Sequence, residues 1–349
     1  MKKGILSVLI LLCVLTTKAQ RYIWSTDSLP DADPGYGMDR YHDILRYHDP
    51  IMYLAFPIIQ PIVDRQVDLQ DGEGKDGYWL QSNFAYRFTI YQGKFYSNPF
   101  LQRMRFTLDA NLASRLTRDD SNPLLPFNNK FGLGLDFLFT SLAALKKEQT
   151  TLAWTTFQLH HYSNGQADSF FIDNPVQRNN YRAGDFSTNY LKFLLNIGRS
   201  STEKSIMLTS FGLQQELDLG GPLSRSKELE SYYGNSRLLF TFQWAQKPKR
   251  VTRHFRDLSN RAGNTVAVEK RQQFGFRTEL EYILGDLDNF PGENKYRLGW
   301  HNYFTYAPSV TNEVGFMAHT FVGRDYLNMR FDDIIFIGEL GLYLKFGTR

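Results

Sequence analysis

The sequence predicts an all-β protein, an antiparallel transmembrane β-barrel of about twelve strands and of the outer-membrane type. Three observations predict this class. The chain begins with an export signal, several later segments alternate between apolar and polar residues, and the last strand presents one continuous apolar face. Together they predict a protein of the bacterial outer membrane.

The first residues have the composition of a secretory signal. Lys2 and Lys3 precede an apolar run over residues 5–15, and small residues follow up to Ala19. The run is too short for a membrane-spanning helix, which needs about 20 apolar residues. We therefore expect cleavage after Ala19. The single cysteine, Cys13, leaves with the signal, so the mature chain is expected to have no thiol or disulfide chemistry.

We expect three parts: a signal peptide over residues 1–19, a periplasmic N-terminal segment over 20–50 and the barrel over 51–349. Residues 20–50 lack the barrel pattern and contain Arg-Tyr-His-Asp twice, which makes His42 and His48 candidate metal ligands. The net charge of +4 is mild for 349 residues, and no concentrated basic face is present. A nucleic-acid-binding class is therefore excluded.

Composition leaves two all-β classes open. Aromatic residues make up 15% of the chain, yet the mean hydropathy is -0.39, and no later stretch is apolar enough for a transmembrane helix. A soluble β-sandwich and an outer-membrane barrel both have this profile, because a barrel strand exposes only alternate residues to lipid. The strand pattern has to decide between them.

Several segments alternate strictly between long apolar residues and polar or charged ones. In the segment from residue 78, the two faces are Leu80, Phe84, Tyr86, Phe88 and Ile90 against Gln81, Asn83, Arg87 and Thr89. In the segment from residue 274, they are Phe276, Leu280, Tyr282 and Leu284 against Arg277, Glu279 and Glu281. A barrel turns the apolar face to lipid and fills its lumen with the charged one.

The end of the chain favours the barrel over the sandwich. Its last segment has one apolar face made of Ile334, Phe336, Gly338, Leu340, Leu342, Leu344 and Phe346. A terminal strand that closes on an aromatic residue is typical of outer-membrane barrels. About twelve segments of this kind are expected to begin near residues 51, 78, 99, 130, 150, 187, 204, 236, 270, 295, 313 and 332.

The connections between these segments mostly alternate between short and long, as periplasmic turns and external loops do. The basic stretch 247–271 departs from this rule, because by count it should be a short periplasmic turn. Either the strands that flank it are longer than expected or the count is wrong by one at this point.

The residues that could carry out chemistry lie where a strand leads into the long connection 164–186. Residues two apart on a strand share a face, so His161 and Ser163 are neighbours. Their face includes Phe157 and Leu159, which points it toward lipid. Polar residues on a lipid-facing wall are costly and tend to be functional.

The next predicted strand supplies a third polar residue. Asn189 shares its face with Leu191 and Phe193, and adjacent strands lie about 4.8 Å apart, so Asn189 is expected beside His161. The three residues suit a nucleophile, a base and an orienting group. Ser163 would attack an ester carbonyl while His161 takes its proton and Asn189 holds the imidazole. The backbone N–H groups of Ser163 and Gly165 would meet the oxyanion.

These residues resemble the outer-membrane phospholipase A family, which has a His-x-Ser-Asn-Gly motif on one strand of a twelve-stranded barrel and an asparagine on the next. The motif corresponds here to His161, Ser163, Asn164 and Gly165, and Asn189 follows Ser187-Thr188. The resemblance implies an outer-membrane phospholipase of A1/A2 type that releases fatty acid from membrane phospholipids. Its active site would face the outer leaflet. The gap from Ser163 to Asn189 is longer than in the family, so residues 166–186 look like an insertion.

The resemblance also implies a calcium cofactor and activity as a homodimer. Calcium would bind through the carbonyl of Gln166 and through Asp185, with Asp218 as a further acidic ligand. The serine that the partner subunit contributes in the family corresponds here to a position near Leu125. The dimer is expected to form through the wall that contains Phe157, Leu159, Leu191 and Phe193.

Two alternatives stay open. Lipid A deacylases are smaller barrels with a His-x-Ser-Asn motif and a glutamate as third member. Residues 149–202 contain no glutamate, although Asp168, Asp173 or Asp185 would be substitutes. The other alternative is a barrel without catalysis, either a narrow channel or a structural protein. Charged residues expected in the lumen disfavour an open pore; they are Arg87, Lys192, Arg277, Glu279, Glu281 and Glu339.

Overall fold

The structure is a computed structural model. It describes residues 44–45, 50–64, 77–92, 100–118, 124–125, 127–140, 150–172, 179–181, 183–200, 205–246, 249–254, 265–270, 273–290, 296–308, 314–327 and 330–344. The expected signal peptide, most of the expected N-terminal segment with His42 and His48, and the terminal Phe346 lie outside this part of the chain.

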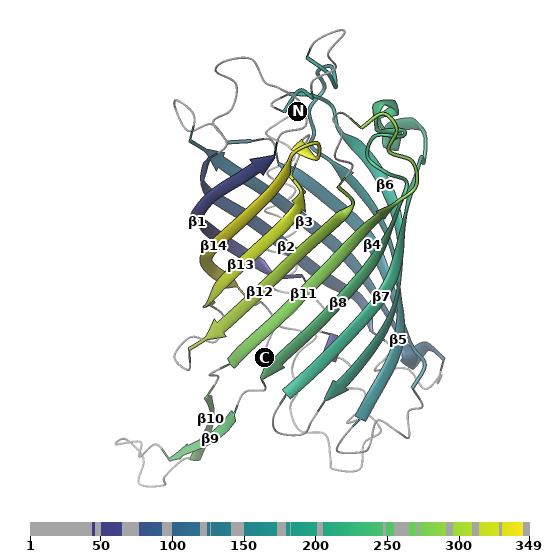
Figure 1. The fold of residues 1–349 in the computed structure, drawn as a ribbon. Coiled ribbons are helices and arrows are strands. Elements are labelled where there is room, and N and C mark those ends of the chain that lie inside the picture. The colour runs from purple at the N-terminus through teal and green to yellow at the C-terminus, as the bar shows by residue number, and fades with distance from the viewer. Residues whose placement is uncertain are drawn as a thin grey trace, which may run out of the picture.

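Twelve antiparallel strands close into one barrel, in the ring order β1-β14-β13-β12-β11-β8-β7-β6-β5-β4-β3-β2 (Figure 1). The first half consists of β1 (Met52–Asp64), β2 (Tyr78–Gln92), β3 (Met104–Thr117), β4 (Asn128–Leu138), β5 (Thr150–Ser163) and β6 (Ser187–Ser200). The second half consists of β7 (Ser205–Leu217), β8 (Ser236–Gln246), β11 (Gln273–Leu284), β12 (Leu298–Ala307), β13 (Val314–Arg324) and β14 (Ile334–Leu344). The predicted fold class is confirmed. One strand begins later than expected, at Met104, because Leu101–Arg103 forms the 3-10 turn η2.

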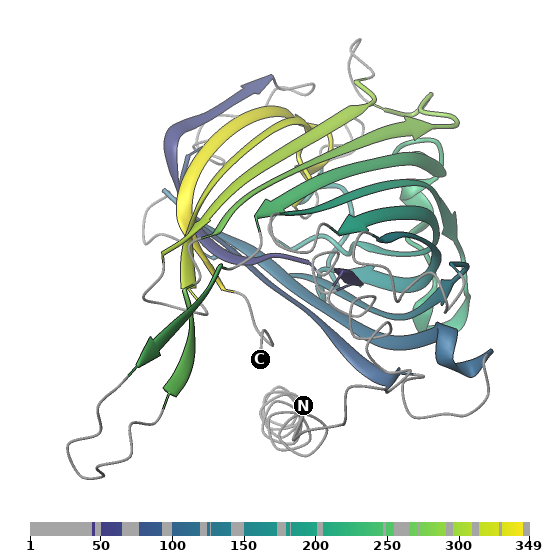
Figure 2. The ribbon, with the colours of Figure 1, turned by 90° about the horizontal axis from the view of Figure 1, so that it is seen from below.

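The basic stretch between β8 and β11 forms a separate hairpin of β9 (Lys249–His254) and β10 (Thr265–Lys270). It projects away from the ring of strands (Figure 2). β8 and β11 pair directly with each other. β9 and β10 follow on from β8 and β11 and continue their pairing with a shift of one residue, from Ala245 with Gly275 to Lys249 with Lys270. The first explanation, longer flanking strands, is therefore close to what the structure shows, and the count of twelve holds.

The outer face of the barrel is apolar. Large side chains exposed on it include Leu133 (58%), Leu195 (52%), Phe211 (59%), Phe304 (53%) and Leu340 (53%). Alternate residues on the same strands point inward, as the predicted period of two requires. No helix in the described ranges is long and apolar enough to cross a bilayer.

Paired charges fill the lumen. Arg87 binds Asp109 at 2.7 Å, Arg105 binds Asp136 at 2.7 Å, and Arg115 binds Asp325 at 2.6 Å. Arg237 lies between Glu216 and Glu281, and His319 contacts Glu339 at 2.7 Å. These pairs leave a polar cavity of about 400 Å³, lined by Lys192 and Arg277 among others. An ion-paired interior disfavours the open-channel alternative.

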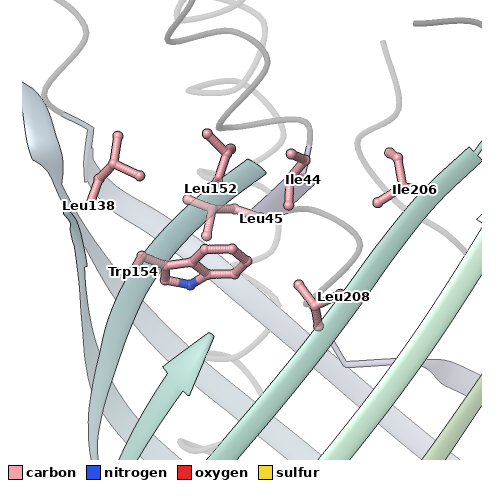
Figure 3. Packing of buried hydrophobic residues seen from close by; sticks show 7 residues of the cluster. All are labelled: Ile44, Leu45, Leu138, Leu152, Trp154, Ile206 and Leu208. Carbon is pink, nitrogen blue, oxygen red and sulfur yellow. The ribbon is translucent and has the colours of Figure 1, made fainter. Parts of the chain in front are cut away.

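Apolar clusters close both ends of the lumen. At the end with the short turns, Ile44 and Leu45 pack against Trp154 and its neighbours Leu138, Leu152, Ile206 and Leu208 (Figure 3). At the end with the long loops, an aromatic cap consists of Tyr162, Phe170, Phe186, Tyr190, Leu229, Tyr232 and Phe331. Much of this cap comes from the long β5–β6 and β7–β8 connections.

The β13–β14 loop adjoins the cap and predicts a pH-dependent stability. Tyr181 donates to the Asp332 carboxylate at 3.1 Å. Burial and the neighbouring Asp333 raise the pKa of Asp332 to about 7, above its usual 3.8. Protonated Asp332 therefore stabilises the fold at low pH, and this contribution is lost as the pH rises through about 7.

We expect amide hydrogen exchange in residues 330–334, corrected for intrinsic rates, to accelerate between about pH 4 and pH 7, the interval between the usual and the raised pKa of Asp332. Asp332→Asn should remove this acceleration, because an amide does not titrate. An equal acceleration in wild type and in Asp332→Asn would contradict the assignment.

Candidate active site on the outer wall

The register of β5 and β6 brings the predicted site residues onto one face. His161 pairs directly with Asn189, and Ser163 pairs with Ser187. Phe157 and Leu159, of the same parity on β5, are 43% and 39% exposed on the outer wall. The residues between them line the lumen. His161, Ser163 and Asn189 therefore lie on the outer face, at the end of the barrel that carries the long loops.

His161 and Asn189 are in direct contact. The imidazole Nδ1 lies 2.9 Å from Oδ1 of Asn189, which is fully buried. The Asn189 Nδ2 donates to the carbonyl of Leu223 at 2.6 Å. Because that carbonyl needs a donor, Oδ1 is left to face His161, and the imidazole then carries its proton on Nδ1. This arrangement leaves Nε2 as the free acceptor.

Ser163 is the last residue of β5 and is half-buried. Within the described chain, its hydroxyl makes no hydrogen bond to His161. The two residues stand about 6.6 Å apart along the strand and share its outer face. Hydrogen bonds between nucleophile and base are often long without substrate. The structure thus brings two of the three residues into contact and places the third beside them.

The side chain of Asn164 stabilises the turn after Ser163, a role that was not expected from the sequence. Its buried side-chain amide donates to the carbonyl of Gly184 at 2.7 Å, and its Oδ1 accepts from the N–H groups of Phe186 and Gln166 at 3.1 and 3.2 Å. Gly165 has a φ of 67°, which favours glycine. The Asn-Gly pair was the available signal for such a turn.

The Gly165 N–H has no acceptor in the part of the chain that the structure describes. It is therefore available for a ligand next to Ser163. The N–H of Asn164 donates instead to the carbonyl of Phe186 at 3.1 Å. Ser163 itself lies within the paired part of β5.

The described parts of the insertion 166–186 pair with each other and pack into the aromatic cap. Asp168 bridges Gly184, and Phe171 bridges Asn179. Phe170 and Phe186 enter the aromatic cap. The register of β5 and β6 continues without a shift below it, so the long spacing between Ser163 and Asn189 does not disturb their faces.

Two of the predicted calcium ligands, Asp218 and Asp185, have other neighbours in the structure. Oδ1 of Asp218 accepts the N–H groups of Gly220 and Arg225 at 3.0 and 3.1 Å, and these bonds lower the pKa of that carboxyl. Burial and the nearby Glu228 raise the pKa of Asp185. Among the residues that the structure covers, no three His, Cys, Asp or Glu side chains are grouped for a metal. Calcium takes six to eight oxygen ligands, so the described carboxylates alone would not complete its coordination.

The fold and its apolar wall define an outer-membrane-type β-barrel with a polar cluster facing outward. No family model and no curated protein matches the sequence. Solved structures similar to the chain include outer membrane phospholipase A from Escherichia coli, at 12% identity and a TM-score of 0.48. Another is the Salmonella typhi outer membrane phospholipase dimer with bound calcium, at 13% and 0.48. Both cover 90% of this chain and 98% of their own. This likeness concerns the fold alone.

Proposed function

We propose that this protein is an outer-membrane serine hydrolase that cleaves acyl esters of phospholipids, of phospholipase A1/A2 type. One observation carries the proposal: the hydrogen bond between His161 and Asn189 on the apolar outer wall, with Ser163 beside it. Polar side chains on a lipid-facing wall are energetically costly, so a cluster of them there indicates a functional site.

The residues have distinct tasks in this reaction. Ser163 Oγ attacks the ester carbonyl as Nε2 of His161 takes its proton, and the same proton passes to the departing alkoxide. A water then attacks the acyl-serine in the same way and releases a fatty acid. Asn189 keeps the Nδ1 proton in place throughout. The N–H of Gly165 would donate to the oxyanion. Ser163, the other expected donor, lies in the ladder between β4 and β5, so its N–H is not given this role.

We place the site toward the outer leaflet. Ser163 leads into a long loop, and long loops of outer-membrane barrels lie outside the cell. The start of β1 pairs with the end of β14, so both ends of the barrel chain lie at the opposite, short-turn end. Phospholipids in that leaflet would meet the site directly.

The test compares substrates. Purified protein in mixed micelles should release fatty acid from a diacyl phospholipid at least about tenfold faster than from lipid A. A preference for lipid A would favour the deacylase alternative, which the Asn189 partner of His161 disfavours because deacylases use a carboxylate there. Absence of hydrolysis from both would favour a structural barrel.

The calcium expectation leads to a prediction about metal removal. Because Asp218 already accepts two backbone N–H groups and no three acidic or histidine side chains are grouped in the described ranges, we propose that calcium has no part in the chemical step. A strong chelator is expected to change the rate of hydrolysis by less than about twofold. A larger loss, restored by calcium in wild type but not in Asp185→Asn, would contradict this and return calcium to Asp185.

We propose that two copies associate through the wall beside the site. Phe157, Leu159 and Leu191 are about two-fifths exposed there, and a second barrel would complete a cleft around an acyl chain. The only cysteine lies in the expected signal, so single cysteines report contacts cleanly.

Under oxidation, Leu159→Cys on β5 should form crosslinked dimers with activity at least equal to the reduced protein. Leu340→Cys on β14, across the barrel, is the matched control and should stay monomeric. Full activity in detergent that keeps the protein strictly monomeric would refute the need for a dimer.

A further inference from the structure

We propose that Asp218 is a positioning residue, which folds the turn after β7 so that the carbonyl of Leu223 holds Asn189 against His161. This inference rests on the proposed function of the site. It assigns Asp218 a task different from the metal ligation expected from the sequence.

The contacts form a continuous chain. Oδ1 of Asp218 accepts the N–H groups of Gly220 at 3.0 Å and Arg225 at 3.1 Å. The 3-10 turn η4 (Gly221–Leu223) lies between these two donors and ends on the carbonyl that binds Asn189 at 2.6 Å. One carboxylate oxygen thus closes the loop from both sides of the group that orients Asn189.

Side-chain packing does little to fix the conformation of this turn. Gly220 and Gly221 have φ values of 71° and 58°, and a Cβ at either position would meet nothing within 4 Å. Two successive glycines in the left-handed region, without packing around them, have many alternative conformations. Leu219 and Leu223 are 46% and 40% exposed. Hydrogen bonds therefore decide the conformation of the turn. Within it, the N–H groups of Leu223 and Ser224 donate to the carbonyls of Gly220 and Gly221 at 3.2 Å, and the two bonds to Asp218 join its two ends.

The turn is also tied to the strand that carries Asn189. Ser187 Oγ donates to the carbonyl of Ser224 at 2.9 Å, and the N–H of Ser226 donates to the carbonyl of Ser187 at 2.8 Å. Ser187 lies two residues before Asn189 on β6. A shift of η4 would therefore move the side-chain amide of Asn189. Small misplacements of groups near the reacting atoms lower the rate of catalysis strongly.

The N–H groups of Gly220 and Arg225 donate to the same oxygen of Asp218, so substitutions that keep or remove this oxygen test the proposal. Asp218→Asn keeps a side-chain carbonyl oxygen that accepts both, whereas Asp218→Ala removes it. If Asp218 were instead a calcium ligand, both variants would lose its negative charge, and both should lose activity. The positioning role predicts a lower kcat, by about tenfold, in Asp218→Ala and a kcat near wild type in Asp218→Asn.

Asp286→Ala is the matched control. Asp286 is exposed in the β11–β12 loop and accepts the N–H of Asp288 at 2.8 Å and the hydroxyl of Ser231 at 3.2 Å, and neither of these partners contacts Asn189 or η4 in the described chain. We expect its activity to be unchanged. Heat-modifiable gel mobility would verify that every variant is a folded barrel.

A double-mutant cycle separates positioning from a general effect on structure. In the Asn189→Ala background, Asp218→Ala should cause no further loss, because the group that it positions is gone. Exchange of the amides in residues 218–226, by mass spectrometry, should accelerate in Asp218→Ala and not in Asp218→Asn.

Three results would overturn the inference: normal activity in Asp218→Ala, equal losses in the alanine and asparagine variants, or multiplicative losses with Asn189→Ala. Each presupposes hydrolysis that depends on Ser163. If wild type and Ser163→Ala release fatty acid equally, the proposed function fails first and the positioning role fails with it. The two failures are therefore distinguishable.

Discussion

Replacing Ser163 with alanine should lower ester hydrolysis by about 10⁴-fold or more, because it removes the proposed nucleophile. The neighbouring serine on this face, Ser187, donates its hydroxyl to the carbonyl of Ser224 at 2.9 Å. His161→Ala should cause a loss of the same order. Because nucleophile and base act as a unit, the double variant should be no worse than either single one. Initial rates of fatty-acid release in mixed micelles measure all three.

Thr209→Ala is a matched control for this prediction. Thr209 is half-buried on the outer face of β7, between the exposed Met207 and Phe211, and has no contact with the site. Its activity should equal that of wild type. Retention of full activity in Ser163→Ala would show that the site has been assigned to the wrong residues.

Arg237→Met should lower the free energy of unfolding by about 3 to 5 kcal/mol. Arg237 is 2% exposed, contacts Glu216 at 2.5 Å and Glu281 at 2.7 Å, and covers the ring of Tyr233 at 4.1 Å. Its loss leaves the fully buried carboxylate of Glu216 without a compensating cation. Chemical denaturation in detergent or lipid measures the change.

Arg199→Met is the comparison for this effect. Arg199 is exposed on the outside of β6, so its replacement should change stability by less than about 0.5 kcal/mol. Equal stability of Arg237→Met and wild type would mean that the lumen is hydrated enough to solvate Glu216, and the case against an open channel would weaken.

The barrel was predictable because its information is local. In a barrel strand, alternate residues belong to the two faces, and segments such as 78–92 and 273–284 keep that alternation over most of their length. In β2 the register shifts only near the two ends. The hairpin of β9 and β10 was not predictable in the same way. Local alternation marks a strand but does not identify its partner, and residues 249–254 pair with residues 265–270 and not with the closed barrel.

Part of the site followed from the strands and part did not. The contact of His161 with Asn189 was expected from neighbouring strands and shared faces. The partner of the Asn189 amide is a backbone carbonyl 34 residues away, and every residue has such a carbonyl, so nothing in the sequence marks Leu223. Asp218 was assigned by resemblance, whereas its turn conformation determines what it binds.

The central claim is that Ser163 is the nucleophile, and covalent labelling tests it most directly. A fluorophosphonate with an alkyl chain should modify folded wild-type protein in detergent at one site, identified by mass spectrometry in the peptide that contains Ser163. Labelling should be lost in Ser163→Ala and slowed by at least about a hundredfold in His161→Ala. Protein that hydrolyses phospholipid while the label sits on another residue, or reacts equally with Ser163→Ala, would contradict the account.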